Sequence, residues 1–109
     1  MATTLKVLGQ KAPIATVLDT LYTVPAATSA VVSSLTVCNR SSTPTTFRIA
    51  IRPAGAAVSN EHYIYYDVPI GGNDTFKATA GFTLATTDVL SCYAGAATLS
   101  FNAYGSEVA

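Results

Sequence analysis

The chain has 109 residues, which is enough for one domain with one hydrophobic core. Half of the residues are apolar and the mean hydropathy is +0.38, which excludes intrinsic disorder, because disorder requires low hydrophobicity. Charged residues make up only 11% and the net charge is zero, which argues against a nucleic-acid partner, because nucleic-acid binding requires a large basic patch.

Short runs rich in Val, Ile, Thr, Tyr and Phe recur about every ten residues, bounded by Pro, Gly, Asn, Asp or Ser. They predict strands near residues 4–9, 15–24, 29–39, 45–53, 62–68, 74–79, 82–85, 88–94 and 97–104. No segment has apolar residues at helical spacing over three turns. We therefore expect an all-β fold, with residues 1–109 forming a single antiparallel β-sandwich. Its topology is expected to be jelly-roll or Ig-like, with about eight to nine short strands.

The two cysteines are expected to remain free thiols. Alternation places Leu35 and Val37 on one face of their strand and Cys38 on the opposite, polar face. Cys92 shares a face with Leu90, which has the composition of a buried side. One core cysteine and one surface cysteine do not meet easily. The first ten residues also lack the features of a signal peptide, which favours a chain made and folded in a cytoplasm.

No apolar run approaches the roughly 18 residues that a membrane-spanning helix needs, so no membrane partner is expected. The surface is instead expected to be rich in small polar side chains, because the chain has 16 Thr and 18 Ala. Removing water from such a surface costs little free energy, whereas a Lys or Glu buried at an interface needs a partner of opposite charge. This favours extensive contact with neighbouring proteins. The alternative is an ordinary β-domain with threonine ladders on exposed strands.

Five residues are predicted to form an interface: Tyr63, Tyr65, Tyr66, Arg48 and Arg52. Three tyrosines within four residues must place at least one ring on each face of a strand. Tyrosine is enriched at interfaces because its ring packs while its hydroxyl bonds. The arginines lie on the polar face of their strand, where they are expected to stack on these rings or pair with nearby acids. The alternative is that the rings fill and flank the core.

His62 and the acids beside it are not expected to form a site. Strand alternation places His62 with Ile64 and Tyr66 on one face. It places Glu61, Tyr63, Tyr65 and Asp67 on the opposite face, so a metal site would need further ligands from another strand. The acids are instead the expected partners of the two arginines.

The sequence contains no G-x-S-x-G elbow, no P-loop and no G-x-G-x-x-G. No catalytic residue, cofactor, metal or small-molecule substrate is therefore predicted, and the chain is not expected to be an enzyme. Asn73, Asp74 and Asp88 have the character of turn residues whose side chains bond nearby backbone.

Three segments, "TLYTVPA", "VCNRSSTPTTFRIAI" and "YIYYDVPIGGNDTF", together resemble a recurrent type of small all-β bacteriophage virion protein. The resemblance extends from "KVLGQKAP" to the final "GSEV". Proteins of this type are head decoration modules, collar pieces, or tail- and fibre-attached modules. The resemblance implies a structural component that is assembled in the host bacterial cytoplasm, resides in the virion and docks on the capsid or tail. It carries no catalytic residues.

A second functional hypothesis is a receptor- or carbohydrate-binding module of a phage fibre or tail. Aromatic and polar side chains on a β-sandwich surface are typical of such modules, in which rings stack on sugars. Tryptophan is usually the main residue that stacks on the sugar in such modules, and the chain has none.

A homo-oligomer is expected, with a trimer favoured over a dimer or a larger ring. Edge strands are normally guarded by Lys, Pro or inward-pointing charge. The segment "ATLSFNAYGSEV" has one charge and "SAVVSSLTVC" has none, so both are expected to need covering by sister copies.

Overall fold

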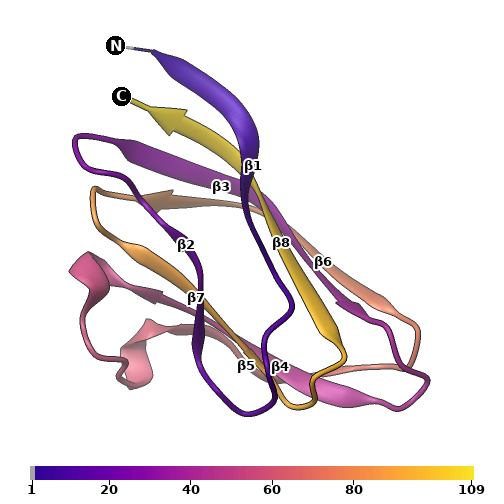
Figure 1. The fold of residues 1–109 in the computed structure, drawn as a ribbon. Helices are drawn as coiled ribbons and strands as arrows, with labels where there is room; N and C mark the ends of the chain where they lie inside the picture. The colour runs from indigo at the N-terminus through magenta and orange to yellow at the C-terminus, as the bar shows by residue number, and fades with distance from the viewer. Residues whose placement is uncertain (1) are drawn as a thin grey trace.

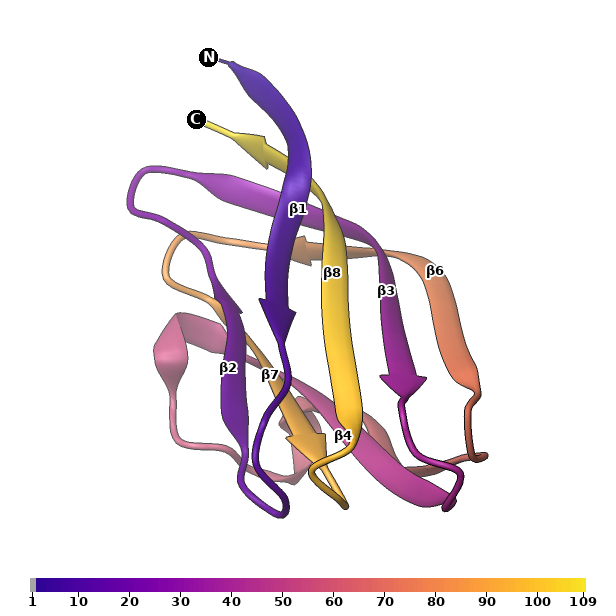
Figure 2. The ribbon, with the colours of Figure 1, turned by 45° about the vertical axis from the view of Figure 1, so that its right-hand side comes forward.

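Two antiparallel sheets of four strands pack face to face in the computed structural model, which describes residues 2–109 (Figures 1 and 2). The elements are β1 (Thr3–Lys11), β2 (Asp19–Thr23), β3 (Ser29–Asn39), β4 (Thr45–Arg52), the 3-10 turns η1 (Pro53–Gly55) and η2 (Asn60–His62), β5 (Tyr63–Ile70), β6 (Thr75–Leu84), β7 (Val89–Ala94) and β8 (Leu99–Val108). Within this described part, no helix has the length and apolarity needed to span a membrane.

The strand order is β1-β8-β3-β6 in what we call the first sheet and β2-β7-β4-β5 in the second sheet. Each strand of the first half of the chain pairs with its counterpart in the second half: β1 with β8, β2 with β7, β3 with β6 and β4 with β5. The chain is thus a doubled ribbon, turned back between β4 and β5 and rolled into two sheets. This is the eight-stranded jelly roll. The predicted all-β sandwich is confirmed, and jelly-roll topology is the one adopted.

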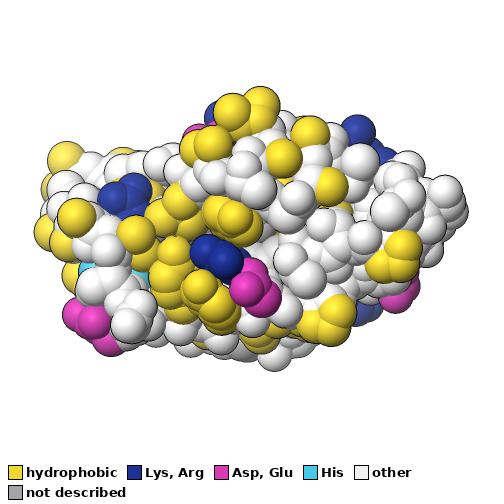
Figure 3. Space-filling view, turned by 90° about the horizontal axis from the view of Figure 1, so that it is seen from below, with side chains coloured by type: hydrophobic (Ala, Val, Ile, Leu, Met, Phe, Trp, Pro, Cys, Tyr) yellow, Lys and Arg dark blue, Asp and Glu magenta, His cyan; other side chains and the backbone are white. Residues whose placement is uncertain are grey.

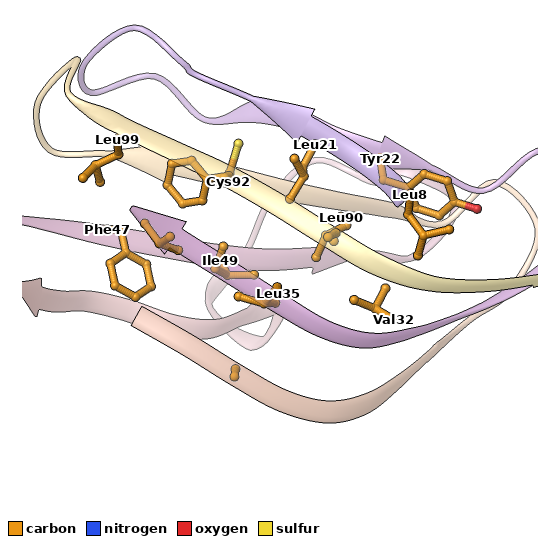
Figure 4. Packing of buried hydrophobic residues seen from close by; sticks show 14 of the residues in the cluster. Leu8, Leu21, Tyr22, Val32, Leu35, Phe47, Ile49, Leu90, Cys92 and Leu99 are labelled. Carbon is orange, nitrogen blue, oxygen red and sulfur yellow. The ribbon is translucent and has the colours of Figure 1, made fainter. Parts of the chain in front are cut away.

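The core lies between the two sheets and follows the predicted alternation. Phe47 and Ile49 of β4 are fully buried, and so are Leu99, Phe101 and Ala103 of β8. All five belong to one core cluster between the sheets. Figure 4 shows Phe47, Ile49 and Leu99 in this layer from close by. Because successive residues of a strand face opposite sides, the intervening residues are left on the outer surfaces.

Two predicted strand boundaries were wrong. Residues 74–79 and 82–85 were expected to be separate strands, but the single strand β6 spans both. β6 continues because β3 is long enough to pair with both parts, with an irregular register at the junction. The strand expected over 15–24 is shorter, because Ala15 makes only an isolated bridge before β2 begins.

The edge strands are not the ones that the sequence suggested. β3 and β8 are central, with hydrogen-bonded neighbours on both sides, so their lack of charge leaves no open edge. The edges are β1 and β6 in the first sheet and β2 and β5 in the second sheet. Each edge carries a residue of a kind that guards edges: β1 has Lys6 and Lys11, β6 has Lys77, β2 has Asp19 and β5 has Pro69. The edge argument for a trimer was therefore wrong, and oligomerisation must be argued from other surfaces.

The predicted turn role of the aspartates is confirmed. The Asp74 carboxylate accepts a hydrogen bond from the Thr75 amide at 2.8 Å. Asp88 accepts one from the Ala85 amide at 2.8 Å and a second from the Ala54 amide at 2.9 Å. Asp88 thereby joins the β6–β7 turn to the segment that follows β4.

The two cysteines lie as predicted, with Cys92 buried in the core and Cys38 half-buried on the outer face of β3, and both are free thiols. Burial raises the pKa of Cys92 to about 12. We expect a thiol reagent at pH 8 to label one cysteine per native chain, Cys38, and to label both in urea, because the thiolate is the reactive form. Mass spectrometry of labelled peptides measures this. Fast labelling of native Cys92 would contradict the packing.

The two sheets are tied together near the chain termini by a polar cluster. The Tyr22 hydroxyl of β2 donates a hydrogen bond to the Glu107 carboxylate of β8 at 2.5 Å, and the Lys6 ammonium of β1 lies 3.4 Å from the same carboxylate. Tyr22 is buried, so its hydroxyl needs this acceptor. The hydrogen bond from Tyr22, aided by Lys6, lowers the pKa of Glu107 below its ordinary value of 4.5.

Replacing Glu107 with glutamine is expected to lower the free energy of unfolding by about 1.5 kcal/mol at pH 7, because a charge-assisted hydrogen bond becomes a neutral one. The pKa of Glu107 is lower in the folded state than in the unfolded state. The stabilisation that the Glu107 charge gives to the fold is therefore complete at pH values above the pKa of the unfolded state. It is lost as the pH falls through the pKa of the folded state. Urea unfolding of both proteins between pH 7 and pH 3 measures this. A difference that stays constant over that range would contradict the role of the charge.

Candidate functional site

The site is built on an irregular stretch of β5. Tyr66 and Asp67 together oppose the single residue Arg48 of β4. A second extra residue, Ile64, lies between the paired residues Tyr63 and Tyr65. These are β-bulges, which insert a residue into one strand of a pair and redirect side chains. Asp67 adopts a positive φ of 49°, a conformation that aspartate tolerates better than most residues.

The bulges change which faces the tyrosines occupy. Tyr63 and Tyr66 contact each other on the outer face, with ring centroids 5.0 Å apart and planes nearly perpendicular. Tyr65 packs inward, 5.2 Å from the ring of Phe76. The predicted grouping of Tyr63 and Tyr65 with Asp67 on one face was therefore wrong, because strict alternation does not survive a bulge. Tyr65 flanks the core and is not part of the site.

Arg48 is the centre of the outer face of the second sheet. Its Nε donates to Asp67 Oδ1 at 2.6 Å and its Nη2 donates to Asp67 Oδ2 at 3.3 Å. The guanidinium also lies over two rings, 4.1 Å from the centroid of Tyr66 and 4.3 Å from that of Tyr93. The hydrogen bond to Asp67 raises the pKa of Arg48, so this side chain stays charged. We call Arg48, Asp67, Tyr63, Tyr66 and Tyr93 the arginine–tyrosine patch.

Figure 3 views the molecule from below and shows a basic side chain next to an acidic one, with hydrophobic side chains gathered mainly around the basic member. Arg48 exposes 22% of its side chain and Asp67 exposes 45%, so the pair is only partly screened by solvent. The guanidinium is held on three sides before any partner binds. The predicted stacking of Arg48 on tyrosine and its pairing with Asp67 are both confirmed.

Arg52, the second predicted arginine, has a different position. Its Nε donates to the buried Ser91 hydroxyl at 3.0 Å, and its Nη1 donates to the carbonyls of Gly55 at 3.2 Å and Ala56 at 2.9 Å. Arg52 therefore anchors the segment that joins β4 to β5. It positions the neighbourhood of the patch and does not belong to it.

His62 takes part in the same connection. Its Nδ1 accepts a hydrogen bond from the Ser59 amide at 3.1 Å, which closes the turn η2. In residues 2–109 there is no group of three or more His, Cys, Asp or Glu side chains arranged to hold a metal ion. His62 thus shapes the approach to β5.

The outer face of the first sheet has a different chemistry. Gln10 of β1 donates a hydrogen bond to the Asn102 side chain of β8 at 2.8 Å, and Thr36 of β3 lies beside Asn102 in register. Around Asn102 this face presents amides and hydroxyls, with the half-exposed Tyr104 ring further along β8, whereas the second sheet presents a guanidinium that lies over two rings. The two faces of the sandwich are therefore suited to different contacts.

Sequence reasoning missed Tyr93. The signal was present, because alternation that places Cys92 in the core places Tyr93 on the outer face of β7. Tyr93 lies directly opposite Arg48 in the β4–β7 pair. What the sequence did not contain was the neighbour relation of β4 and β7, which are far apart in the chain.

We compared the chain with protein-family models, with curated proteins and with solved structures, and no match was found in any of the three comparisons.

Proposed function

We propose that this chain is a non-enzymatic structural component of a bacteriophage particle that docks on the capsid or tail through its second sheet. The eight-stranded jelly roll is an architecture of viral capsid domains, and also of lectins and cupins. A fold shared so widely does not select a function, so the proposal depends on the surface.

The observation that carries the proposal is the arginine–tyrosine patch. Arginine and tyrosine are, with tryptophan, the residue types enriched among the residues that contribute most to binding energy at protein interfaces. Arg48 is already fixed by Asp67 and by two rings, so little side-chain entropy remains to be lost when a partner binds. The pair is internally neutral, which lowers the cost of burying it under a partner protein.

The low charge of the rest of the surface supports the same role. Only 11% of the residues are charged, and three of the six acids form ion pairs within the chain, namely Glu107, Asp19 and Asp67. A component that touches several virion proteins benefits from such a surface, because amides and hydroxyls are desolvated at lower cost than free charges. Its proposed place is the virion, after assembly in the host bacterial cytoplasm, with other virion proteins as partners.

The test uses phage particles from which the gene for this chain has been deleted. Purified full-length protein is mixed with these particles and with particles that already contain it, and both are sedimented. We expect saturable binding to the deleted particles alone, because only they have vacant positions. Protein that stays in the supernatant with both particles would contradict the proposal.

We also propose that the chain is a homo-oligomer, with a trimer favoured. Large apolar side chains remain uncovered in one copy, among them Leu5, which is 82% exposed, and Ile14, which is 67% exposed. Closed symmetry buries the same surface in every copy. Multi-angle light scattering is expected to give three times the 11.2 kDa mass of the chain. A monomer at micromolar concentration would contradict the oligomer.

A further inference from the structure

A surface hollow of about 340 Å³ lies where η2 meets β5, and it is lined by Asn60, Tyr63 and Tyr66. Arg48 covers one face of the Tyr66 ring, yet Tyr66 remains 57% exposed. The Tyr63 ring stands at 85° to it and forms a second wall. The hollow therefore offers aromatic surface in two orientations.

The polar groups of the hollow restrict its occupant. Each of the three lining residues combines a packing surface with a hydrogen-bonding end, namely a phenol hydroxyl or a carboxamide. A purely apolar side chain would bury these ends without partners, which is costly. An anionic group would have to compete with Asp67 for the nearby Arg48 guanidinium, because both oxygens of that carboxylate already accept hydrogen bonds from it.

A neutral sugar ring matches this lining, because its C–H face packs on an aromatic ring while its hydroxyls donate and accept hydrogen bonds. We propose that the hollow is a binding subsite for one neutral sugar unit of an oligosaccharide. This inference goes beyond docking on the particle. The subsite shares Tyr63 and Tyr66 with the arginine–tyrosine patch and adds Asn60, which has no part in that patch.

The site is largely formed before binding. The Ser59 amide donates to His62 Nδ1, and the His62 amide donates to the Ser59 carbonyl at 3.0 Å, so the turn that carries Asn60 is closed at both ends. Arg52 holds the preceding residues through the carbonyls of Gly55 and Ala56. A preformed site loses less entropy on binding than a mobile loop does.

The test is an NMR titration of the full chain with maltopentaose, cellopentaose and mannopentaose, with an acidic galacturonate oligomer and N-acetyl-leucinamide as comparators. At least one neutral oligosaccharide is expected to shift the amides of residues 60–66, with a Kd of about 1 mM for one bound ring. No shift from any neutral oligosaccharide at about 10 mM, roughly ten times that Kd, would overturn the proposal. Tighter binding of the acidic oligomer or of the leucine amide would also overturn it.

Variants separate this subsite from docking. Asn60→Ala and Tyr63→Ala are each expected to weaken saccharide binding at least about fivefold. Tyr104→Ala, which removes a half-exposed tyrosine from the first sheet, is the matched control and leaves the Kd unchanged.

Tyr93→Ala is expected to weaken particle binding and leave the saccharide Kd unchanged, whereas Asn60→Ala does the reverse. A failure of the subsite is therefore distinguishable from a failure of docking. Saccharide binding that survives both Asn60→Ala and Tyr63→Ala would place the ligand elsewhere and overturn the assignment.

Discussion

Replacing Phe47 with alanine is expected to lower the free energy of unfolding by about 3–5 kcal/mol. Phe47 is fully buried on β4 and contacts rings from both sheets. Its centroid lies 4.9 Å from that of Phe76 and 6.3 Å from that of Phe101 in the first sheet, and 6.5 Å from that of Tyr65 in its own sheet. Removing this ring leaves a cavity between the sheets and removes three aromatic pairs at once.

Urea unfolding followed by far-ultraviolet circular dichroism measures the effect. Total stability of a domain is typically about 5–15 kcal/mol, so Phe47→Ala removes a large share of it. Phe47→Leu, which keeps much of the volume, is the milder variant and keeps the comparison measurable. Val58→Ala is the matched control, because Val58 is an exposed side chain in the segment between η1 and η2 and its truncation is expected to change stability by less than about 0.5 kcal/mol. Equal effects at both positions would contradict the described core.

Replacing Arg48 with alanine is expected to weaken binding to gene-deleted phage particles by about 30-fold to 1000-fold, the range for a central interface arginine. The effect on folding is expected to be smaller, about 1–2 kcal/mol, because the ion pair and the stacked rings are partly exposed. Arg48→Lys keeps the charge but loses the planar fork that stacks on two rings and bonds Asp67 twice. It is expected to weaken binding at least about tenfold.

Sedimentation with the deleted particles over a range of protein concentrations gives these affinities. Arg40→Ala is the matched control, because Arg40 is an exposed arginine outside the second sheet. Unchanged binding of Arg48→Ala, together with its normal folding, would show that the particle contacts another surface.

Much of the fold was predictable because apolar and polar residues alternate along a strand whose one face is buried, so the pattern indicates which residues lie in the core. β4 and β8 each have one buried face, so Phe47 and Ile49, or Phe101 and Ala103, recur at every second position. The same reasoning placed Cys92 correctly in the core. Where a strand is regular and has one solvent-exposed face, the alternation of apolar and polar residues indicates which face is buried.

The candidate site was predictable only in part, because β5 is irregular. One extra residue reverses the faces of all residues beyond it, and a bulge has no reliable signature in a single sequence. Tyr63 and Tyr66 therefore meet on one face although alternation separates them. Arg48 was placed correctly because the extra residues lie in β5, whereas β4 pairs with β7 in an unbroken register.

Long-range relations were the least predictable. The order of strands in a sheet depends on pairings between distant segments, so the sequence did not reveal that β3 and β8 are central. Asn39 is a further example, because its position before a turn suggests exposure, yet it is buried. Its side chain donates to the carbonyls of Thr43 and Gly71 and accepts from the Thr98 hydroxyl. It thereby joins three loops that only the folded chain brings together.

The most direct test of the central proposal is a cryo-electron microscopy map of the phage particle that contains this chain, compared with a map of the gene-deleted particle. The difference density is expected to fit the jelly roll, with the outer face of β2, β7, β4 and β5 turned toward the capsid or tail and Arg48 within the contact. Difference density with that face open to solvent, or no difference between the two maps, would contradict the proposal.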